Sequence, residues 1–187
     1  MKKVLIASAL SAVMALPVSA IAADYKIDTT HAFVNFKVNH LGYSFIQGRF
    51  NKFEGNFSYD KADVAASSIT FEVDTTSLDS NHAERDKHLK GSKYIGADKY
   101  STATFVSTSI AEKADGGLTV TGDMTFHGVT KPIVVDAKLV GEGNDPWGNY
   151  RAGLEGTTRL ELAEFGMDVK GASTYADLDI VFEGIRQ

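Results

Sequence analysis

Hydrophobic and polar residues alternate with a period of two along most of the chain after residue 22. Such alternation is typical of β-strands that bury one face and expose the other. The pattern predicts about eight strands, and residues 45–59 would form one bent strand. The alternating runs are 32–40, 53–59, 68–74, 103–113, 118–127, 133–139, 151–162 and 176–183. In the run 103–113, apolar residues occur on both faces in places, so the pattern does not decide which of its faces points inward.

Short glycine-rich segments separate several of these runs, as at 115–117, 127–130 and 141–148. Short turns between consecutive strands indicate an antiparallel meander. Eight one-sided strands can form a sandwich or close into a barrel, and closure also removes the exposed edges. The pattern therefore predicts an all-β antiparallel fold and leaves both the sandwich and the barrel open. No linker divides residues 23–187, so we expect one domain.

The stretch 79–94 interrupts the strand pattern and predicts a short helix at 82–90. Asn81 can cap this helix, with Glu84 three positions on, and Gly91 would end it. Asp86 and Lys90 have the spacing of an exposed ion pair. We expect Arg85 and Asp86 to anchor the helix over one barrel end, and Leu89 and Tyr94 to face the interior.

The same stretch concentrates histidines and acids, so we considered it as a metal site. His82 and His88 are six residues apart and lie on roughly opposite faces of a helix, and only Glu84 and His88 are spaced to share a metal ion. Local capping and pairing explain most of the charge. We therefore predict a structural helix without a metal.

Residues 1–22 have the features of a cleaved signal peptide. Lys2 and Lys3 precede the apolar run 4–16, Pro17 ends it, and Ala20-Ile21-Ala22 supplies a small-x-small cleavage pattern. The run is shorter than the ~20 residues of a membrane span. We predict cleavage after Ala22 and a periplasmic location, with no stable membrane insertion.

Charge and composition narrow the classes of function. The chain lacks cysteine, and without Lys2 and Lys3 it has 17 basic against 24 acidic residues, a net charge near −7. Such an acidic chain without basic blocks is a poor candidate for binding nucleic acid or anionic lipid surfaces. It has no Gly-x-Ser-x-Gly or phosphate-loop motif. A barrel enzyme that acts on an apolar substrate, with His40 or His88 as general base, remains an alternative. A stress-related interaction protein whose barrel is merely packed is another.

Aromatic residues are dense between Phe33 and Tyr59. Each one alone is best explained by core packing, but together they give more flat apolar surface than a filled small barrel needs. We therefore expect an apolar tunnel, and the length of the strands favours an elongated ligand over a compact one. The residues predicted to line or border it are Phe36, Val38, Phe45, Phe50, Phe53, Phe57, Phe71, Leu89, Tyr94, Met124, Phe126, Val135, Leu154, Ile180 and Phe182.

Several motifs at their observed spacing are similar to one known family. They are the segments 31–36 (HAFVNF), 40–43 (HLGY), 48–50 (GRF), 81–89 (NHAERDKHL), 121–132 (TGDMTFHGVTKP) and 164–167 (EFGM). In these the chain resembles the YceI-like family of bacterial, mostly periplasmic, polyisoprenoid-binding proteins. The resemblance covers essentially residues 23–187.

The resemblance implies a lipocalin-like, extended eight-stranded antiparallel β-barrel. It also implies that the barrel holds a long polyisoprenoid chain, or a quinone that carries one. Related members bind other long-chain amphiphiles, so the head group is left open. The resemblance also suggests a homodimer. We expect a carrier or sequestering protein without chemistry of its own, one bound chain per barrel, and no other cofactor.

Overall fold

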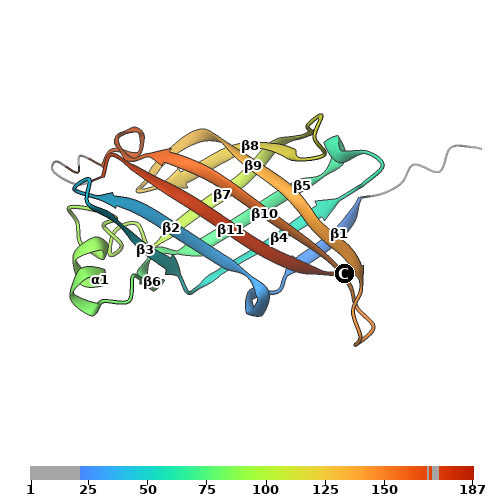
Figure 1. The fold of residues 1–187 in the computed structure, drawn as a ribbon, viewed down its shortest axis with the longest axis horizontal. Helices are drawn as coiled ribbons and strands as arrows, with labels where there is room; N and C mark the ends of the chain where they lie inside the picture. The colour runs from blue at the N-terminus through green and yellow to red at the C-terminus, as the bar shows by residue number, and fades with distance from the viewer. Residues whose placement is uncertain (1–21, 168, 170–172) are drawn as a thin grey trace, which may run out of the picture.

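The computed structural model describes residues 22–167, 169 and 173–187, and places them in an antiparallel β-barrel with one short α-helix at one end (Figure 1). The predicted signal peptide lies outside the described residues apart from Ala22. The strands are β1 (Ala23–Ile27), β2 (Phe33–His40), β3 (Ser44–Phe50), β4 (Phe53–Tyr59), β5 (Ser68–Asp74), β6 (Leu78–Asp79), β7 (Thr102–Glu112), β8 (Leu118–Phe126), β9 (Val129–Asn144), β10 (Tyr150–Glu161) and β11 (Tyr175–Arg186).

Pairing between the first and last strands closes the barrel. The order is β1-β4-β5-β7-β8-β9-β10-β11, and β1 returns to pair with β11. β2 and β3 continue the lines of β1 and β4, since β2 pairs with the first half of β11 and β3 pairs with β2. The predicted bent strand 45–59 is thus β3 and β4, broken at Asn51–Lys52. The predicted eight-stranded closed barrel is confirmed.

Short helices occupy the breaks and one end of the barrel. The 3-10 turns are η1 (Thr29–His31), η2 (Val64–Ala66), η3 (Thr75–Ser77) and η4 (Leu162–Phe165), and the α-helix is α1 (Ala83–Lys90). α1 lies near the β2–β3 turn at one end of the barrel, whereas β1 and the C-terminus lie at the other (Figure 1). In the described parts of the chain, no helix combines the length and apolar character that crossing a membrane requires.

The α1 helix is close to its predicted position, but its cap differs. His82 is the N-cap, and its Nδ1 accepts a hydrogen bond from the Arg85 backbone N–H at 3.2 Å. Asn81, the predicted cap, instead has a positive φ of 63°. Asparagine tolerates this left-handed conformation well, so it serves as the turn before the helix. Gly91 ends the helix as predicted.

Buried Ser80 holds α1 in place. Its hydroxyl donates to Asp86 Oδ1 and accepts a hydrogen bond from Arg85 Nε at 2.8 Å, and its backbone N–H donates to the same carboxylate at 2.8 Å. Arg85 and Asp86 do anchor the helix, and they do so through this serine. The predicted Asp86–Lys90 pair is wrong, because Asp86 turns toward Ser80 and Lys90 Nζ donates to the Thr76 carbonyl at 3.3 Å.

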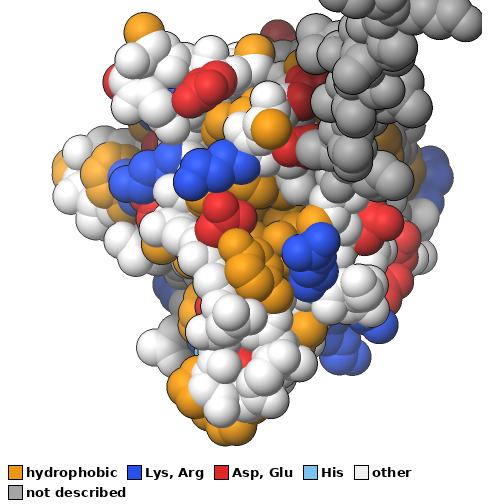
Figure 2. All heavy atoms as spheres, turned by 90° about the vertical axis from the view of Figure 1, so that its right-hand side faces the viewer, with side chains coloured by type: hydrophobic (Ala, Val, Ile, Leu, Met, Phe, Trp, Pro, Cys, Tyr) orange, Lys and Arg blue, Asp and Glu red, His pale blue; other side chains and the backbone are white. Residues whose placement is uncertain are grey.

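Aromatic side chains pack against one another in the barrel half away from α1, which we call the solid half. Tyr25 and Phe57 stack with ring centroids 4.7 Å apart, and Phe57 meets the edge of Phe182 at 5.4 Å. A Cβ at Gly184 would lie 2.5 Å from the Phe57 ring, so only glycine leaves room for it. Figure 2 shows this end from outside, where hydrophobic side chains lie in the middle with charged side chains around them.

An ion network lies on this half of the barrel. Arg151 donates to Asp28 at 2.8 Å, to Asp145 at 2.7 Å and to Glu183 at 2.7 Å. The guanidinium holds the pKa of both Asp28 and Asp145 well below the ordinary range of a carboxyl group. Among the described residues, Asp28, His31 and Glu183 form a group with metal-ligating geometry. The Arg151 cation already lies against two of its carboxylates, so we assign the group to the ion network.

Candidate functional site: an apolar cavity in the barrel

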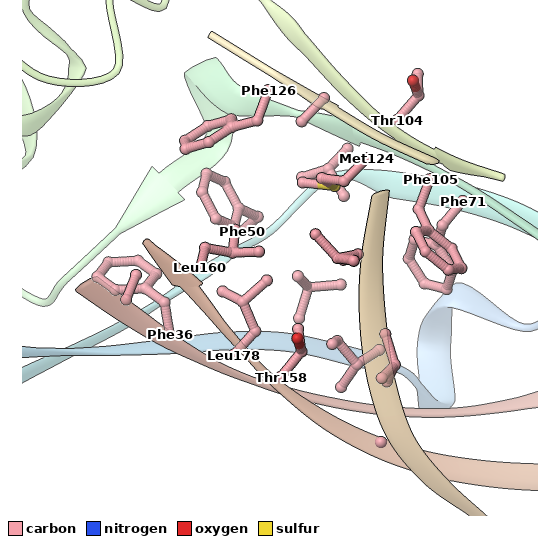
Figure 3. A pocket seen from close by; sticks show the side chains of 18 of the residues that line it. Phe36, Phe50, Phe71, Thr104, Phe105, Met124, Phe126, Thr158, Leu160 and Leu178 are labelled. Atoms are coloured by element: carbon pink, nitrogen blue, oxygen red, sulfur yellow. The ribbon is translucent and has the colours of Figure 1, made fainter. Parts of the chain in front are cut away.

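A cavity of about 220 Å³ occupies the barrel between Phe182 in its middle and α1 at its end. All but a few of its lining residues are apolar. They come from β2, β3, β5 to β11, α1, η4 and the irregular segments that follow α1 and η4. In Figure 3, Phe36, Phe50 and Phe126 surround it on one side, and Phe71 and Phe105 lie on the other. An apolar cavity with few polar groups suits a hydrocarbon ligand and offers little to orient a reacting one.

Glycines on the wall keep the cavity open. A Cβ at Gly48 would lie 2.3 Å from the Phe36 ring, and one at Gly122 would lie 2.4 Å from the Phe105 ring. Both rings therefore lie close over backbone that carries no side chain. With larger residues at these two glycines, the rings would have to turn away from the wall. The wall is thus built from large side chains and still leaves space in its centre.

The barrel wall changes beside the cavity, where β9 and β10 separate. Their pairing ends at Thr157–Asp136, and beyond it β9 pairs with β8 while β10 pairs with β11. The Thr158 hydroxyl donates to the Val134 carbonyl at 2.8 Å and joins the two strands at this point. Val135 and Thr158, from opposite sides of the separation, both line the cavity.

Twelve of the fifteen predicted tunnel residues line this cavity. They are Phe36, Val38, Phe50, Phe71, Leu89, Tyr94, Met124, Phe126, Val135, Leu154, Ile180 and Phe182. Leu89 and Tyr94 do so from α1 and the segment that follows it.

The other three predicted residues lie away from the cavity. Phe57 points inward but packs below Phe182 in the solid half of the barrel. Phe53 stacks on the far side of the wall residue Phe71, at 5.7 Å. Phe45 points outward on β3, 52% exposed, with the Lys37 ammonium 4.9 Å from its ring. Its prediction rested on aromatic density, which does not distinguish the two faces of a strand.

Some wall residues were missed by the sequence prediction. Leu160 and Leu178 line the cavity and share the inward alternation of Leu154 and Ile180, so continuing that alternation would have found them. Met167 and Val169 also line it, from an irregular segment that has no period to follow.

The candidate general bases of the enzyme alternative lie outside the cavity wall. His40 is exposed at the end of β2. His88 is exposed on α1, and its ring meets the edge of Tyr94 with centroids 5.4 Å apart. The lining residue Glu155 directs its carboxylate to Lys138 Nζ at 2.8 Å, and both side chains are substantially exposed. Within the described chain, this geometry does not bring an acid–base pair together in the cavity.

The comparisons with known proteins agree with this architecture. The model of the YceI-like domain matches residues 25–184. The chain belongs to the YceI-like family. Two similar proteins, each named UPF0312 protein, come from Vibrio cholerae and Shewanella sp. They are 60% and 50% identical to this chain, and each alignment covers both chains in full.

Solved structures share the family's barrel at low sequence identity. BcnA of Burkholderia cenocepacia superposes with a TM-score of 0.76 at 20% identity, covering 84% of this chain and 98% of its own. A polyisoprenoid-binding domain from Saccharophagus degradans superposes with a TM-score of 0.66 at 16% identity, covering 89% and 99%. At such identities the likeness establishes the fold.

Proposed function

We propose that this protein is a periplasmic carrier that holds a long polyisoprenoid chain, of a lipid or an isoprenoid quinone, in the barrel cavity. The apolar cavity closed by aromatic packing at one end is the observation that carries the proposal. Each methylene group that moves from water into such a cavity contributes ~0.8 kcal/mol. A long chain can therefore bind tightly without many polar contacts.

The ligand class draws support from the family and from one structural neighbour. The Saccharophagus degradans domain is a polyisoprenoid-binding domain and has the same fold. The periplasmic location rests on the sequence features of residues 1–22. The proposed ligand-binding residues are the twelve predicted ones in the cavity wall, and the proposed entrance lies beside α1, because aromatic packing fills the opposite end. A homodimer stays a prediction from the family.

Native mass spectrometry of the mature protein, stripped of lipid and free of detergent, tests the proposal. The protein is titrated with an isoprenoid quinone and, in parallel, with a saturated fatty acid. We expect one isoprenoid chain per barrel. The variant Met124→Trp fills the cavity and should weaken binding at least about tenfold, because it displaces several buried carbons of the ligand.

Asp123→Trp is the matched control, because Asp123 is the neighbouring exposed residue on β8 and faces outward. It should leave the affinity unchanged. If the wild-type protein binds no isoprenoid chain, or if both tryptophan variants bind it equally well, the proposed function is wrong. Turnover of an apolar substrate that is lost in His40→Ala or His88→Ala would instead support the enzyme.

A further inference from the structure

The turn between β2 and β3 carries exposed apolar side chains at the α1 end of the barrel. Tyr43 is 88% exposed and Leu41 is 60% exposed. Val38, three residues before Leu41, lines the cavity. The β2–β3 tip, residues 41–43, therefore projects from the same end of the barrel as the cavity, next to α1 (Figure 1). Outward-facing Phe45 extends the apolar surface along β3.

The backbone of the tip does not explain its leucine. Leu41 and Gly42 both have positive φ, 56° and 80°. Hairpin turns with this geometry favour Asn, Asp or Gly, and a bulky residue there is strained. The Asn39 side chain accepts a hydrogen bond from the Gly42 N–H at 2.7 Å and fixes the turn. A leucine that is neither buried nor favoured by its backbone points to a contact outside the chain.

Positive charge gathers beside the tip, although the whole chain has more acids than bases. Residues 82–99 contain five bases and three acids. One acid and one base of these, Asp86 and Arg85, are both bound to Ser80. Lys87, Lys93 and Lys99 are exposed. Such a local excess of positive charge favours an anionic partner.

We propose that the β2–β3 tip and the lysines of residues 82–99 dock the barrel reversibly on an anionic lipid bilayer, with the cavity end toward the lipid. Apolar and tyrosine side chains enter the interface between head groups and acyl chains, and nearby lysines contact the anionic head groups. The inference rests on the proposed function, since an isoprenoid chain is dissolved in a bilayer. Docking would let the isoprenoid chain of the ligand pass between the bilayer and the cavity over a short path through water.

Vesicle flotation with the mature protein tests the docking. Vesicles of phosphatidylethanolamine and phosphatidylglycerol are compared with vesicles of phosphatidylcholine alone. The wild-type protein should bind the anionic vesicles more tightly. The double variant Leu41→Asn, Tyr43→Ser should lose at least about tenfold in binding, because both apolar contacts are removed. Its turn should stay intact, since asparagine suits a positive φ.

Trp147→Ser is the matched control. Trp147 is 79% exposed between β9 and β10, at the barrel end away from α1. It should bind vesicles as the wild type does. Equal loss in both variants, or no loss in the tip variant, would overturn the docking proposal. A tip variant that changes only the oligomeric state, measured by light scattering, would mean that a second copy of the chain covers the tip.

The same variants are titrated with the isoprenoid quinone in solution, without vesicles. If the wild type binds the quinone and fails to bind vesicles, only the docking proposal is wrong. If it binds vesicles and no isoprenoid, the proposed function is wrong and the docking surface would need another purpose. If docking holds, the tip variant binds quinone in solution with unchanged affinity and extracts it more slowly from anionic vesicles.

Discussion

Filling the cavity with a larger side chain distinguishes a binding cavity from an ordinary core. Val135 lies on β9 in the cavity wall, over Gly156, where a Cβ would come within 2.9 Å of it. Val135→Phe adds about four carbon atoms to the side chain. At ~0.8 kcal/mol per buried carbon, a ring that fits the cavity raises the free energy of unfolding of the ligand-free protein by up to about 3 kcal/mol. In a core packed to ordinary density, the same change would cost about 1–3 kcal/mol.

The matched control is Ala152→Leu, which adds about three carbon atoms in the solid half of the barrel. Ala152 is fully buried and belongs to the cluster around Tyr25 and Phe57. The Ala152→Leu variant should lose about 1–3 kcal/mol of unfolding free energy, because the added carbon atoms overpack this site. Chemical denaturation of both variants gives the two free energies of unfolding.

Binding of the isoprenoid should change as well. Val135→Phe takes the place of about four ligand carbons, which corresponds to ~3 kcal/mol or a roughly hundredfold higher Kd. If Val135→Phe destabilised the protein as much as Ala152→Leu and left isoprenoid binding intact, the cavity would not be the binding site.

Three further changes test the parts that support the cavity. The pKa values of Asp28 and Asp145 are depressed, so their ion pairs with Arg151 contribute stability above the unfolded carboxyl pKa of ~3.9 and lose it as pH falls below that value. Denaturation between about pH 6 and pH 2 should therefore show a shallower loss of stability in Arg151→Met than in the wild type. Equal slopes would contradict this. Ser80→Ala removes the hydroxyl that donates to Asp86 and leaves Arg85 Nε without this acceptor, so it should cost about 1–3 kcal/mol of unfolding free energy and speed hydrogen exchange in α1 first. Uniform exchange changes would refute its role as the anchor. Thr158→Val removes the hydrogen bond from the Thr158 hydroxyl to the Val134 carbonyl, which joins β10 to β9, and should cost about 0.5–1.5 kcal/mol of unfolding free energy. Faster hydrogen exchange should be confined to residues near the separation of the two strands. Unchanged exchange there would mean that this hydrogen bond does not hold the strands together.

Alternation along the sequence predicts which face of a strand is inward, and it led to most of the twelve predicted residues that line the cavity. The choice of a barrel over a sandwich came from the resemblance to the family. It does not give the height of a residue along the barrel. Phe57 and Phe182 both point inward, yet only Phe182 lies high enough to reach the cavity. The depth of a side chain depends on the register between strands that are distant in sequence, and alternation does not contain that register.

A β-bulge explains why the sequence pattern did not decide the inward face of residues 103–113. The pairing of β7 with β8 shifts between Ser107 and Ser109. Ala103 is inward before the shift and Ile110 is inward after it, each 4% exposed. One extra residue reverses the alternation, so no single period describes the whole strand. The cap of α1 was missed for a similar reason, because the left-handed turn at Asn81 moved the start of the helix by one residue.

The central claim is that the barrel carries a long isoprenoid chain in its cavity. The most direct measurement is mass spectrometry of an organic-solvent extract of the protein, purified from its own cells without detergent. The account predicts an isoprenoid lipid or quinone at about one molecule per barrel, and much less of it in Val135→Phe purified in parallel. An extract without any isoprenoid, or with equal amounts from both proteins, would contradict it.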